Sequence, residues 1–265
     1  MDSATALELY RHALTARQLD TTEKDLIQSN LSAFCVLCAG HEATAALAPS
    51  LTADDWLCCH YRDRALLLAR GLTTEKLLLT SLGRRGSDSD GRRMPGFYFD
   101  PTLNLANPTT LVGNNALQAV GVAARLKATL GNAIVYCGLG DGATQEGEFY
   151  EAVAEAAREK LPVLFAVGDN SYALSTPTRG RTFYSLPDGE PESFFGLPIQ
   201  RLDGADLAAC HDGLAETVAA IRRDQTPAVV VIDLPRLSSH TSSDDHTQYR
   251  LLEEIAELEK RDPLP

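Results

Sequence analysis

Several features are scarce or missing in this sequence, and each absence excludes a class of protein. Lys and Arg number 24 against 36 Asp and Glu, so a formal net charge of −12 leaves no electrostatic footprint for nucleic acid or an anionic membrane. No uninterrupted apolar run approaches the ~20 residues that span a bilayer. Residues 1–5 lack the basic and apolar regions of a signal peptide, so we expect a cytoplasmic protein.

Cysteine is also sparse, with six residues in the chain. Cys35 and Cys38 have the C-x-x-C spacing of metal and redox sites, but no second C-x-x-C pair and no histidine pair completes a zinc site. Apolar neighbours at Phe34, Val36 and Leu37 favour buried free thiols instead. We therefore expect both cysteines to lie in the core.

Hydrophobic residues make up 44% of the 265 positions, which is enough for one α/β domain with a sizeable core. Apolar runs at 133–138 and 228–234 indicate buried parallel strands. Helical periodicity marks the segments 115–130 and 207–223. Strands that alternate with helices through right-handed crossovers predict a doubly wound, mainly parallel sheet with helices on both faces.

The first 50 or so residues are predicted to be mainly helical. Near-helical spacing of apolar residues between Ala4 and Leu19 indicates an amphipathic helix. A second helical segment is expected to begin at Gly40 and to end before Pro49. We expect residues 1–265 to form a single domain that includes this helical segment.

The most informative segment of the chain runs from residue 140 to residue 172. Asp141 follows one apolar run and Asn170 follows the next. On a strand–helix–strand unit, both side chains lie just past the carboxyl ends of adjacent parallel strands. A carboxylate, an amide oxygen and nearby backbone carbonyls are hard oxygen ligands, and they suit a Mg²⁺ ion that keeps open positions for phosphate oxygens.

This pattern resembles the Mg²⁺–thiamine diphosphate motif of the thiamine-dependent enzymes. More closely, residues 140–147 and 170–177 look like a shortened α subunit of the E1 component of 2-oxo acid dehydrogenases, of the branched-chain or pyruvate type. The resemblance implies thiamine diphosphate and Mg²⁺ as cofactors. It also implies that Asp141, Asn170 and the backbone carbonyl of Tyr172 bind the metal.

The diphosphate end of the cofactor has its own set of groups in this resemblance. Gly140 belongs to the turn, and Gly142 and Ala143 approach the diphosphate through backbone N–H groups at a helix N-terminus, where the helix dipole favours an anion. Tyr61 and Arg62 bind it through a phenol hydrogen bond and a guanidinium fork. Without the resemblance, a Tyr-Arg pair would indicate only a surface ion pair.

Thr110 and Val112 are implied to present backbone groups to the aminopyrimidine of the cofactor. The side chain of Val112 would hold the cofactor in its bent shape, a task that suits a stiff β-branched residue. The alternative interpretation of Val112 is an ordinary core valine.

Arg236 and His240 lie in the loop after the strand at 228–234, and the family has a loop here that covers the cofactor. The resemblance counts both residues as cofactor-binding, with Arg236 as an anchor of the loop. His240 would exchange protons at the reacting carbon and meet the acyl acceptor. The alternative for His240 is a solvated side chain in a polar loop.

The resemblance implies an enzyme that decarboxylates a 2-oxo acid and passes the acyl group to a lipoyl group on an E2 protein. The chain supplies only the diphosphate-binding half of such a site. The resemblance therefore implies a β subunit that provides the pyrimidine-binding domain and an activating glutamate, most simply in an α2β2 assembly.

Two other functions remain open at the level of sequence. The first is a related carboligase or acyl transferase that forms an acyloin or loads an acyl carrier, because Gly168, Phe97 and Ser239 stand where branched-chain subunits have an arginine and two histidines. The second is a nucleotide-binding protein that is not an enzyme, in which the glycine turn binds a dinucleotide and Asp169 binds its ribose.

Overall fold

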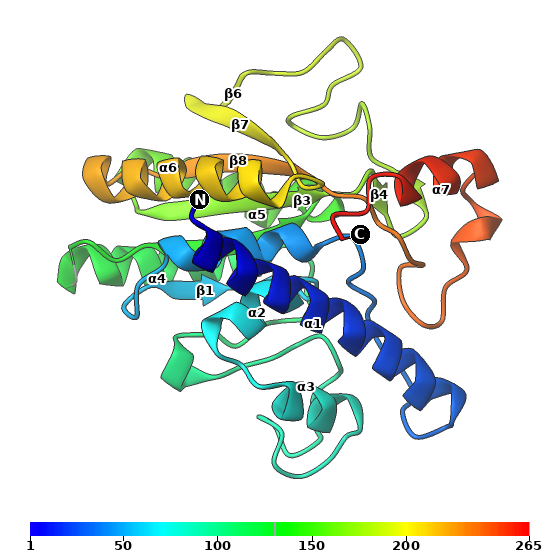
Figure 1. Ribbon diagram of the computed structural model, residues 1–265. Coiled ribbons are helices and arrows are strands. Elements are labelled where there is room, and N and C mark those ends of the chain that lie inside the picture. Colours follow the sequence, from blue (N-terminus) through cyan, green and yellow to red (C-terminus); the bar gives the residue numbers. More distant parts are fainter. Residues whose placement is uncertain (130, 265) are drawn as a thin grey trace.

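A computed structural model describes residues 1–129 and 131–264. A six-stranded sheet lies at its centre, with the strand order β1-β2-β3-β8-β7-β6 (Figure 1). Neighbouring strands are parallel except for β6, which pairs antiparallel with β7 at one edge. The strands are β1 (Trp56–Cys58), β2 (Val135–Gly140), β3 (Val163–Asp169), β6 (Ser193–Phe194), β7 (Leu197–Asp203) and β8 (Ala228–Asp233), and a separate hairpin joins β4 (Tyr172–Ala173) to β5 (Thr176–Pro177).

Helices cover both faces of the sheet, which confirms the predicted doubly wound α/β architecture (Figure 1). α1, η1, α2 and α6 pack on one face, and α4 and α5 pack on the other. Within the described residues, no helix is both long and apolar enough to cross a membrane. The helices are α1 (Ser3–Gln28), η1 (Glu42–Ser50), α2 (Arg64–Arg70), α3 (Thr74–Ser81), η2 (Pro101–Leu103), α4 (Asn115–Thr129), η3 (Gly142–Gln145), α5 (Gly147–Glu159), α6 (Leu207–Asp224), η4 (His246–Gln248) and α7 (Leu252–Glu259).

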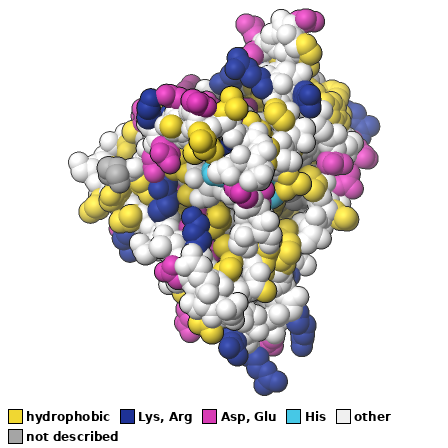
Figure 2. Space-filling view, turned by 90° about the vertical axis from the view of Figure 1, so that its right-hand side faces the viewer, with side chains coloured by type: hydrophobic (Ala, Val, Ile, Leu, Met, Phe, Trp, Pro, Cys, Tyr) yellow, Lys and Arg dark blue, Asp and Glu magenta, His cyan; other side chains and the backbone are white. Residues whose placement is uncertain are grey.

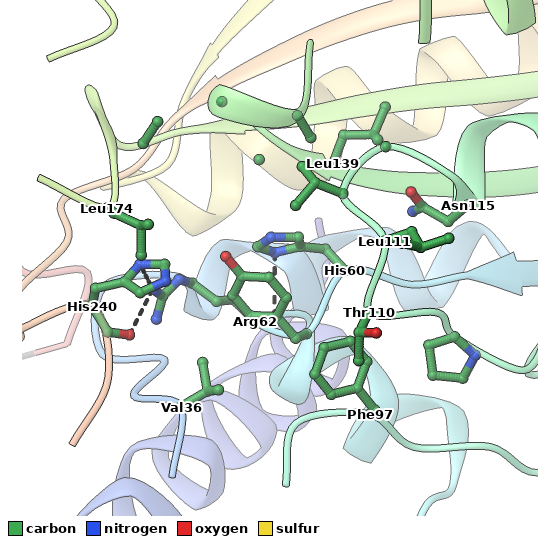
Figure 3. A pocket seen from close by; sticks show the side chains of 18 of the residues that line it. Val36, His60, Arg62, Phe97, Thr110, Leu111, Asn115, Leu139, Leu174 and His240 are labelled. Carbon is green, nitrogen blue, oxygen red and sulfur yellow. Dashed lines mark hydrogen bonds between the residues drawn. The ribbon is translucent and has the colours of Figure 1, made fainter. Parts of the chain in front are cut away.

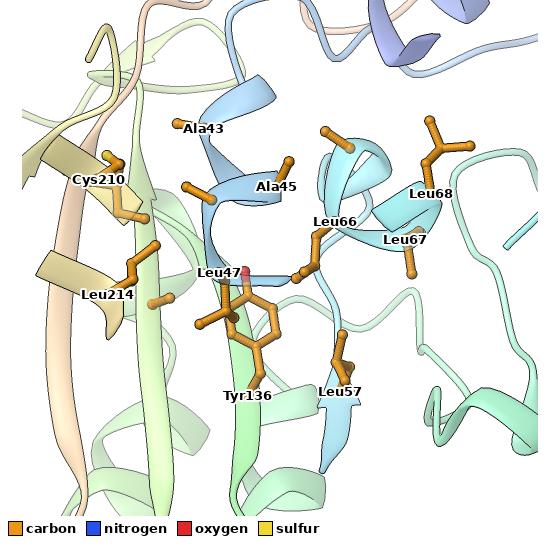
Figure 4. Packing of buried hydrophobic residues seen from close by; sticks show 14 of the residues in the cluster. Ala43, Ala45, Leu47, Leu57, Leu66, Leu67, Leu68, Tyr136, Cys210 and Leu214 are labelled. Atoms are coloured by element: carbon orange, nitrogen blue, oxygen red, sulfur yellow. The ribbon is translucent and has the colours of Figure 1, made fainter. Parts of the chain in front are cut away.

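The core has two layers because successive side chains of a strand point to opposite faces. On one face, Tyr136 of β2 packs among Leu47 of η1 and Leu66 of α2 (Figure 4). On the other face, Cys137 packs with Phe149 of α5. Each strand that was predicted from an apolar run therefore contributes side chains to both layers of the core.

Three predicted helices have different limits in the structure. The helix expected over residues 4–19 continues to Gln28. The segment expected to end before Pro49 is a 3-10 helix that includes this proline. The helix expected over 115–130 ends at Thr129, and Leu130 lies outside the described residues.

The extension of α1 has a clear physical cause. Beyond Leu19 its buried face carries Asp20 and Glu23, which are both ion-paired to Arg64 of α2 at 2.6 Å. Charged residues interrupt the apolar periodicity from which a helix is predicted, although they pack like core residues here. Asp20 also accepts hydrogen bonds from the backbone N–H groups of Cys38 and Ala39.

The burial predicted for Cys35 and Cys38 is confirmed, and both are free thiols. Burial raises the pKa of the Cys35 thiol to about 11 and raises that of Cys38 further still. Both side chains are therefore protonated and act as small core residues.

We predict that Arg64→Met destabilises the protein by about 3–5 kcal/mol, because Asp20 and Glu23 would remain buried without a cation. Arg158→Met is the matched control, since Arg158 is exposed and pairs with Glu155 on the surface of α5. Its effect should stay within about 1 kcal/mol. Urea unfolding followed by circular dichroism measures both values, and equal losses for the two variants would contradict the prediction.

Candidate functional site

A cavity of about 400 Å³ opens where β1, β2 and β3 reach their carboxyl ends. Figure 2 shows this face of the molecule, with histidine side chains in a hollow bordered by hydrophobic ones. Every residue predicted for the site lines the cavity except Arg236. These lining residues are Tyr61, Arg62, Thr110, Val112, Gly140, Asp141, Gly142, Ala143, Asn170, Tyr172 and His240.

Asp141 is the buried acid of this cavity, with 2% of its surface exposed. Its Oδ1 accepts a hydrogen bond from the N–H of Gly142 at 3.0 Å, and its Oδ2 accepts one from the hydroxyl of Thr178 at 2.7 Å. Burial raises the pKa of Asp141 above its ordinary value. Within residues 1–129 and 131–264, no Lys, Arg or His forms an ion pair with it, so a bound cation would relieve the cost of its burial.

Asn170 lies beside Asp141, as the sequence predicts. Gly140 pairs with Gly168 across β2 and β3, so the residues that follow these strands share one edge of the sheet. The side-chain oxygen of Asn170 accepts a hydrogen bond from the N–H of Tyr172 at 3.3 Å. The side chain of Tyr172 donates to Glu254 at 3.0 Å, so its polar tip is engaged with α7.

Within the described residues, no group of three or more His, Cys, Asp or Glu could hold a metal ion. A metal at this edge would therefore depend on a mixed set of one carboxylate, one amide oxygen and carbonyl groups. Such a set suits Mg²⁺, which commonly takes few protein ligands together with phosphate oxygens and water.

The glycine turn differs in one respect from the expectation. Gly142 begins the 3-10 turn η3, and α5 starts only at Gly147, so the predicted helix N-terminus lies one turn further along the chain. A Cβ atom on Gly142 would lie 2.6 Å from the Cβ of Ala173. Glycine is therefore required here because the turn packs directly against the β4–β5 hairpin.

Arg62 and His240 form the opposite wall of the cavity (Figure 3). Nη2 of Arg62 lies 2.9 Å from Nδ1 of His240 and donates to the His240 carbonyl oxygen at 2.8 Å, while Nη1 donates to the carbonyl of Leu37. Burial, and then the charge of Arg62, lower the pKa of His240 to about 3. His240 is thus neutral, and its Nδ1 accepts from Arg62, which leaves the proton on Nε2.

Thr110 and Val112 lie on the exposed rim of the cavity. Val112 is 60% exposed, so the interpretation of this residue as an ordinary core valine is wrong. Thr110 lies across the cavity from His240 and Arg62 (Figure 3), and the side chain of Leu111 is exposed.

Sequence reasoning missed several lining residues, of which His60 is the most notable. Its Nδ1 accepts from the backbone N–H of Arg62 at 3.3 Å, and its ring lies 3.8 Å from the ring of Tyr61. Burial lowers the pKa of His60 to about 3. Its position beside the Tyr-Arg pair was the only signal in the sequence. Other missed residues are Met94, Phe97, Glu146 and Leu174.

Arg236 is buried behind the wall of the cavity. It donates to the carbonyl of Leu174 at 2.9 Å and to the hydroxyl of Tyr249 at 2.8 Å. Arg236 thus joins the loop after β8 to the segment after β4.

Asp169, the candidate ribose acid of a nucleotide site, faces a different cavity. It lies there with Asp203 and Asp233 at the ends of β7 and β8. The glycine turn and Asp169 therefore do not share a binding pocket, which removes the geometric basis of the nucleotide-binding interpretation.

The family model described as "Dehydrogenase E1 component" matches residues 10–265. The chain belongs to this family. The E1 resemblance predicted from the motifs is thereby confirmed, and the chain is an E1 α-type enzyme subunit of the 2-oxo acid dehydrogenases.

Several curated relatives cover nearly the whole chain. It is 29% identical over 263 residues to the 2-oxoisovalerate dehydrogenase subunit alpha of Bacillus subtilis, which covers 98% of this chain and 79% of that protein. It is 32% identical to the 3-methyl-2-oxobutanoate dehydrogenase subunit alpha of Mycobacterium tuberculosis and 30% identical to the pyruvate dehydrogenase E1 component subunit alpha of Staphylococcus aureus. Each of these two alignments covers 97% of this chain and 68% of the relative.

Among solved structures, transketolase from Campylobacter jejuni shares the fold of this E1 α-type chain. The TM-score is 0.64 at 18% sequence identity, and the match covers 100% of this chain and 43% of that one. The likeness supports the α/β fold assignment.

Asp63 gives the E1 α-type chain a predicted pH dependence. Its Oδ2 accepts from the backbone N–H of His60 at 2.7 Å and from the hydroxyl of Tyr136 at 3.0 Å, and burial raises its pKa to about 7. The folded state therefore binds a proton that the unfolded state releases near pH 4. The contribution of Asp63 to the free energy of unfolding should therefore be greatest below pH 4 and should be lost as the pH rises toward 7.

Asp63→Asn should remove this component of the pH dependence, because one amide oxygen can accept both hydrogen bonds without carrying a charge. Urea unfolding at pH 5 and pH 8 measures it, with the exposed Asp54→Asn as control. If Asp63→Asn loses as much stability between these pH values as the wild type, another group carries the effect.

Proposed function

We propose that this chain is the α subunit of a thiamine diphosphate- and Mg²⁺-dependent E1 enzyme that decarboxylates a 2-oxo acid and transfers the acyl group to lipoyl-E2. Residues 1–265 then form one diphosphate-binding domain, and the enzyme acts in the cytoplasm. The observation that carries the proposal is the buried Asp141, without a cationic partner in the described chain, beside Asn170 at the edge of a cavity in an E1-family fold.

The residues at this edge fit the metal and the diphosphate. Asp141 and Asn170 would each supply one oxygen to Mg²⁺, and Tyr172 would supply its backbone carbonyl, since its hydroxyl is engaged with Glu254. Gly142 and Ala143 line the cavity with no side chain larger than a methyl group, so that the diphosphate can approach the backbone of the turn.

Tyr61 and Arg62 would neutralise and orient the diphosphate from the opposite wall. Arg62 is already fixed by Leu37 and His240, so little side-chain entropy would be lost on binding. Gly168 offers no side chain to the anion. His60, which precedes Tyr61 in the chain, lies over Gly140 and is neutral, and its Nε2 would act as a hydrogen-bond donor because its Nδ1 accepts from Arg62.

Bound thiamine diphosphate supplies the electron sink that makes loss of CO₂ from a 2-oxo acid feasible. The protein would hold the pyrimidine end between Thr110 and Val112 at the open rim. His240 would donate its Nε2 proton as a hydrogen bond to oxygen on the substrate, because Nδ1 is occupied by Arg62. Its low pKa makes this donor role better suited to the structure than proton exchange near neutral pH.

The open rim also supports the proposal of a partner. Leu111 and Val112 are exposed beside the cavity, and exposed apolar groups of this kind commonly mark an interface. A β subunit placed there would complete the site with its pyrimidine-binding domain and its activating glutamate, in an α2β2 assembly.

A second candidate, an E1-like carboligase or acyl transferase acting on another acceptor, is favoured by one observation. Phe97 lines the cavity where the branched-chain pattern has a histidine, so this part of the wall is apolar. Acylation of a lipoyl domain by the purified complex would favour the dehydrogenase, and acyloin formation without it would favour the carboligase.

Asp141→Ala should abolish Mg²⁺-dependent binding of thiamine diphosphate. We expect a loss of more than about 100-fold, because a direct ligand should matter more than a supporting residue, whose loss costs ~10–100-fold. Calorimetry of the chain co-expressed with its partner measures the affinity. Asp203→Ala, at the end of β7, is the control and should bind normally. Undiminished affinity in Asp141→Ala would overturn the metal assignment.

His240→Ala should reduce acyl transfer by about 10²-fold or more, because a hydrogen-bond donor to developing charge would be lost. Affinity for thiamine diphosphate should fall only modestly. Parallel assays of CO₂ release and acceptor acylation separate the two steps. His246→Ala is the control, since this residue belongs to the same segment but not to the cavity lining. Wild-type rates of both steps in His240→Ala would show that His240 has no catalytic role.

A further inference from the structure

Asn170 has a buried partner that the proposed function does not use. Nε2 of His41 lies 3.2 Å from Nδ2 of Asn170. Both residues are buried, and His41 comes from the segment that precedes η1, far from Asn170 in the sequence. Nδ1 of His41 has no hydrogen-bond partner in the described part of the chain. The contact therefore joins a proposed metal ligand to a histidine whose side chain forms no other hydrogen bond with the described part of the chain.

The surroundings of Asn170 decide which way its amide points. The backbone N–H of Tyr172 can only donate, so the atom that it meets at 3.3 Å must be the side-chain oxygen. The atom that faces His41 is then the NH₂ group. Since this group can only donate, Nε2 of His41 must accept, and the imidazole proton must be on Nδ1.

The chain holds His41 in this place through its backbone. Gly40 has φ +92°, and a Cβ atom there would lie 1.5 Å from the carbonyl oxygen of Pro235. Only glycine allows this close approach between the segment before η1 and the chain that leaves β8. The N–H of Leu237 donates to the carbonyl of Ala39 at 3.2 Å and fastens the same two segments together.

We propose that His41 is a positioning residue, which accepts a hydrogen bond from Asn170 and thereby turns the amide oxygen toward the metal. The proposal rests on the proposed function, in which Asn170 is a metal ligand. His41 does not touch the metal, and it acts through the orientation of Asn170 alone.

The physical basis is the cost of a wrong amide orientation. If Asn170 lost its acceptor, a buried NH₂ group would be left without a partner, which costs about 1–3 kcal/mol. Rotation of the amide would relieve that cost only by presenting hydrogen atoms to a cation. Partners of this kind fix the ligands of many metal sites, and their loss commonly weakens metal binding by ~10–100-fold.

The test compares His41→Leu with His41→Gln in this chain co-expressed with its partner. Mn²⁺ replaces Mg²⁺ as the probe, and its affinity is measured by electron paramagnetic resonance at saturating thiamine diphosphate. His41→Leu removes the acceptor and should weaken Mn²⁺ binding by ~10–100-fold. His41→Gln offers an amide oxygen to Asn170 and should recover most of the affinity.

His211→Leu is the matched control, because His211 of α6 is partly buried and its side chain also forms a hydrogen bond, with Nδ1 3.1 Å from the carbonyl oxygen of Ala46 in η1. It should leave the Mn²⁺ affinity unchanged. A merely structural role for His41 would lower the melting temperature in both His41 variants without the recovery of Mn²⁺ affinity in His41→Gln. Wild-type affinity in His41→Leu, or equal losses in the two variants, would overturn the proposal.

Two further results separate this proposal from the proposed function. If the wild type shows no Mn²⁺-dependent cofactor binding, the proposed function itself fails, and the role of His41 fails with it. If His41→Leu does not fold, ¹⁵N NMR of the wild type reads the tautomer directly. A proton on Nδ1 supports the proposal, and a proton on Nε2 contradicts it.

Discussion

The burial of one carboxylate, that of Asp141, is the constraint on which the site depends. A buried charge without a cation is costly, and hydrogen bonds from Gly142 and Thr178 offset only part of that cost. Such an arrangement is stable in a folded protein when a cation can join it, or when the group takes up a proton. The surrounding small residues, the facing amide and the open cavity are all consistent with the first solution.

A second cluster of buried charges helps to position the wall of the cavity that Arg62 and His240 form. Arg64 ties α1 to α2 through Asp20 and Glu23, and Asp20 in turn holds the backbone at Cys38 and Ala39. This is the stretch of chain that leads to His41 and whose Leu37 carbonyl binds Arg62. The ion pairs in the core thus connect the N-terminal helix with the geometry of the site.

Sequence reasoning succeeded where the chemistry is local and failed where it depends on partners distant in the chain. The continuation of α1 beyond Leu19 was missed because Asp20 and Glu23 look like surface residues until Arg64 is placed beside them. Val112 could not be assigned to core or rim from its type alone, and its exposure follows from the packing of neighbouring elements. Sequence reasoning assigned no role to His60 or His41, because their side chains act through contacts with Arg62 and Asn170, which are apparent only in the folded chain.

The sequence by itself determined the doubly wound class and the meeting of Asp141 with Asn170, because alternating apolar runs and parallel strands leave few other arrangements. The E1 resemblance came from the motifs at residues 140–147 and 170–177. The tertiary structure alone decided that His240 is neutral and bound to Arg62, that Arg236 lies behind the wall, and that Asp169 faces a separate cavity. These features depend on burial and on side-chain direction. Burial and side-chain direction are set by how helices and loops cover the two faces of the sheet, and neither can be predicted from a local pattern in the sequence.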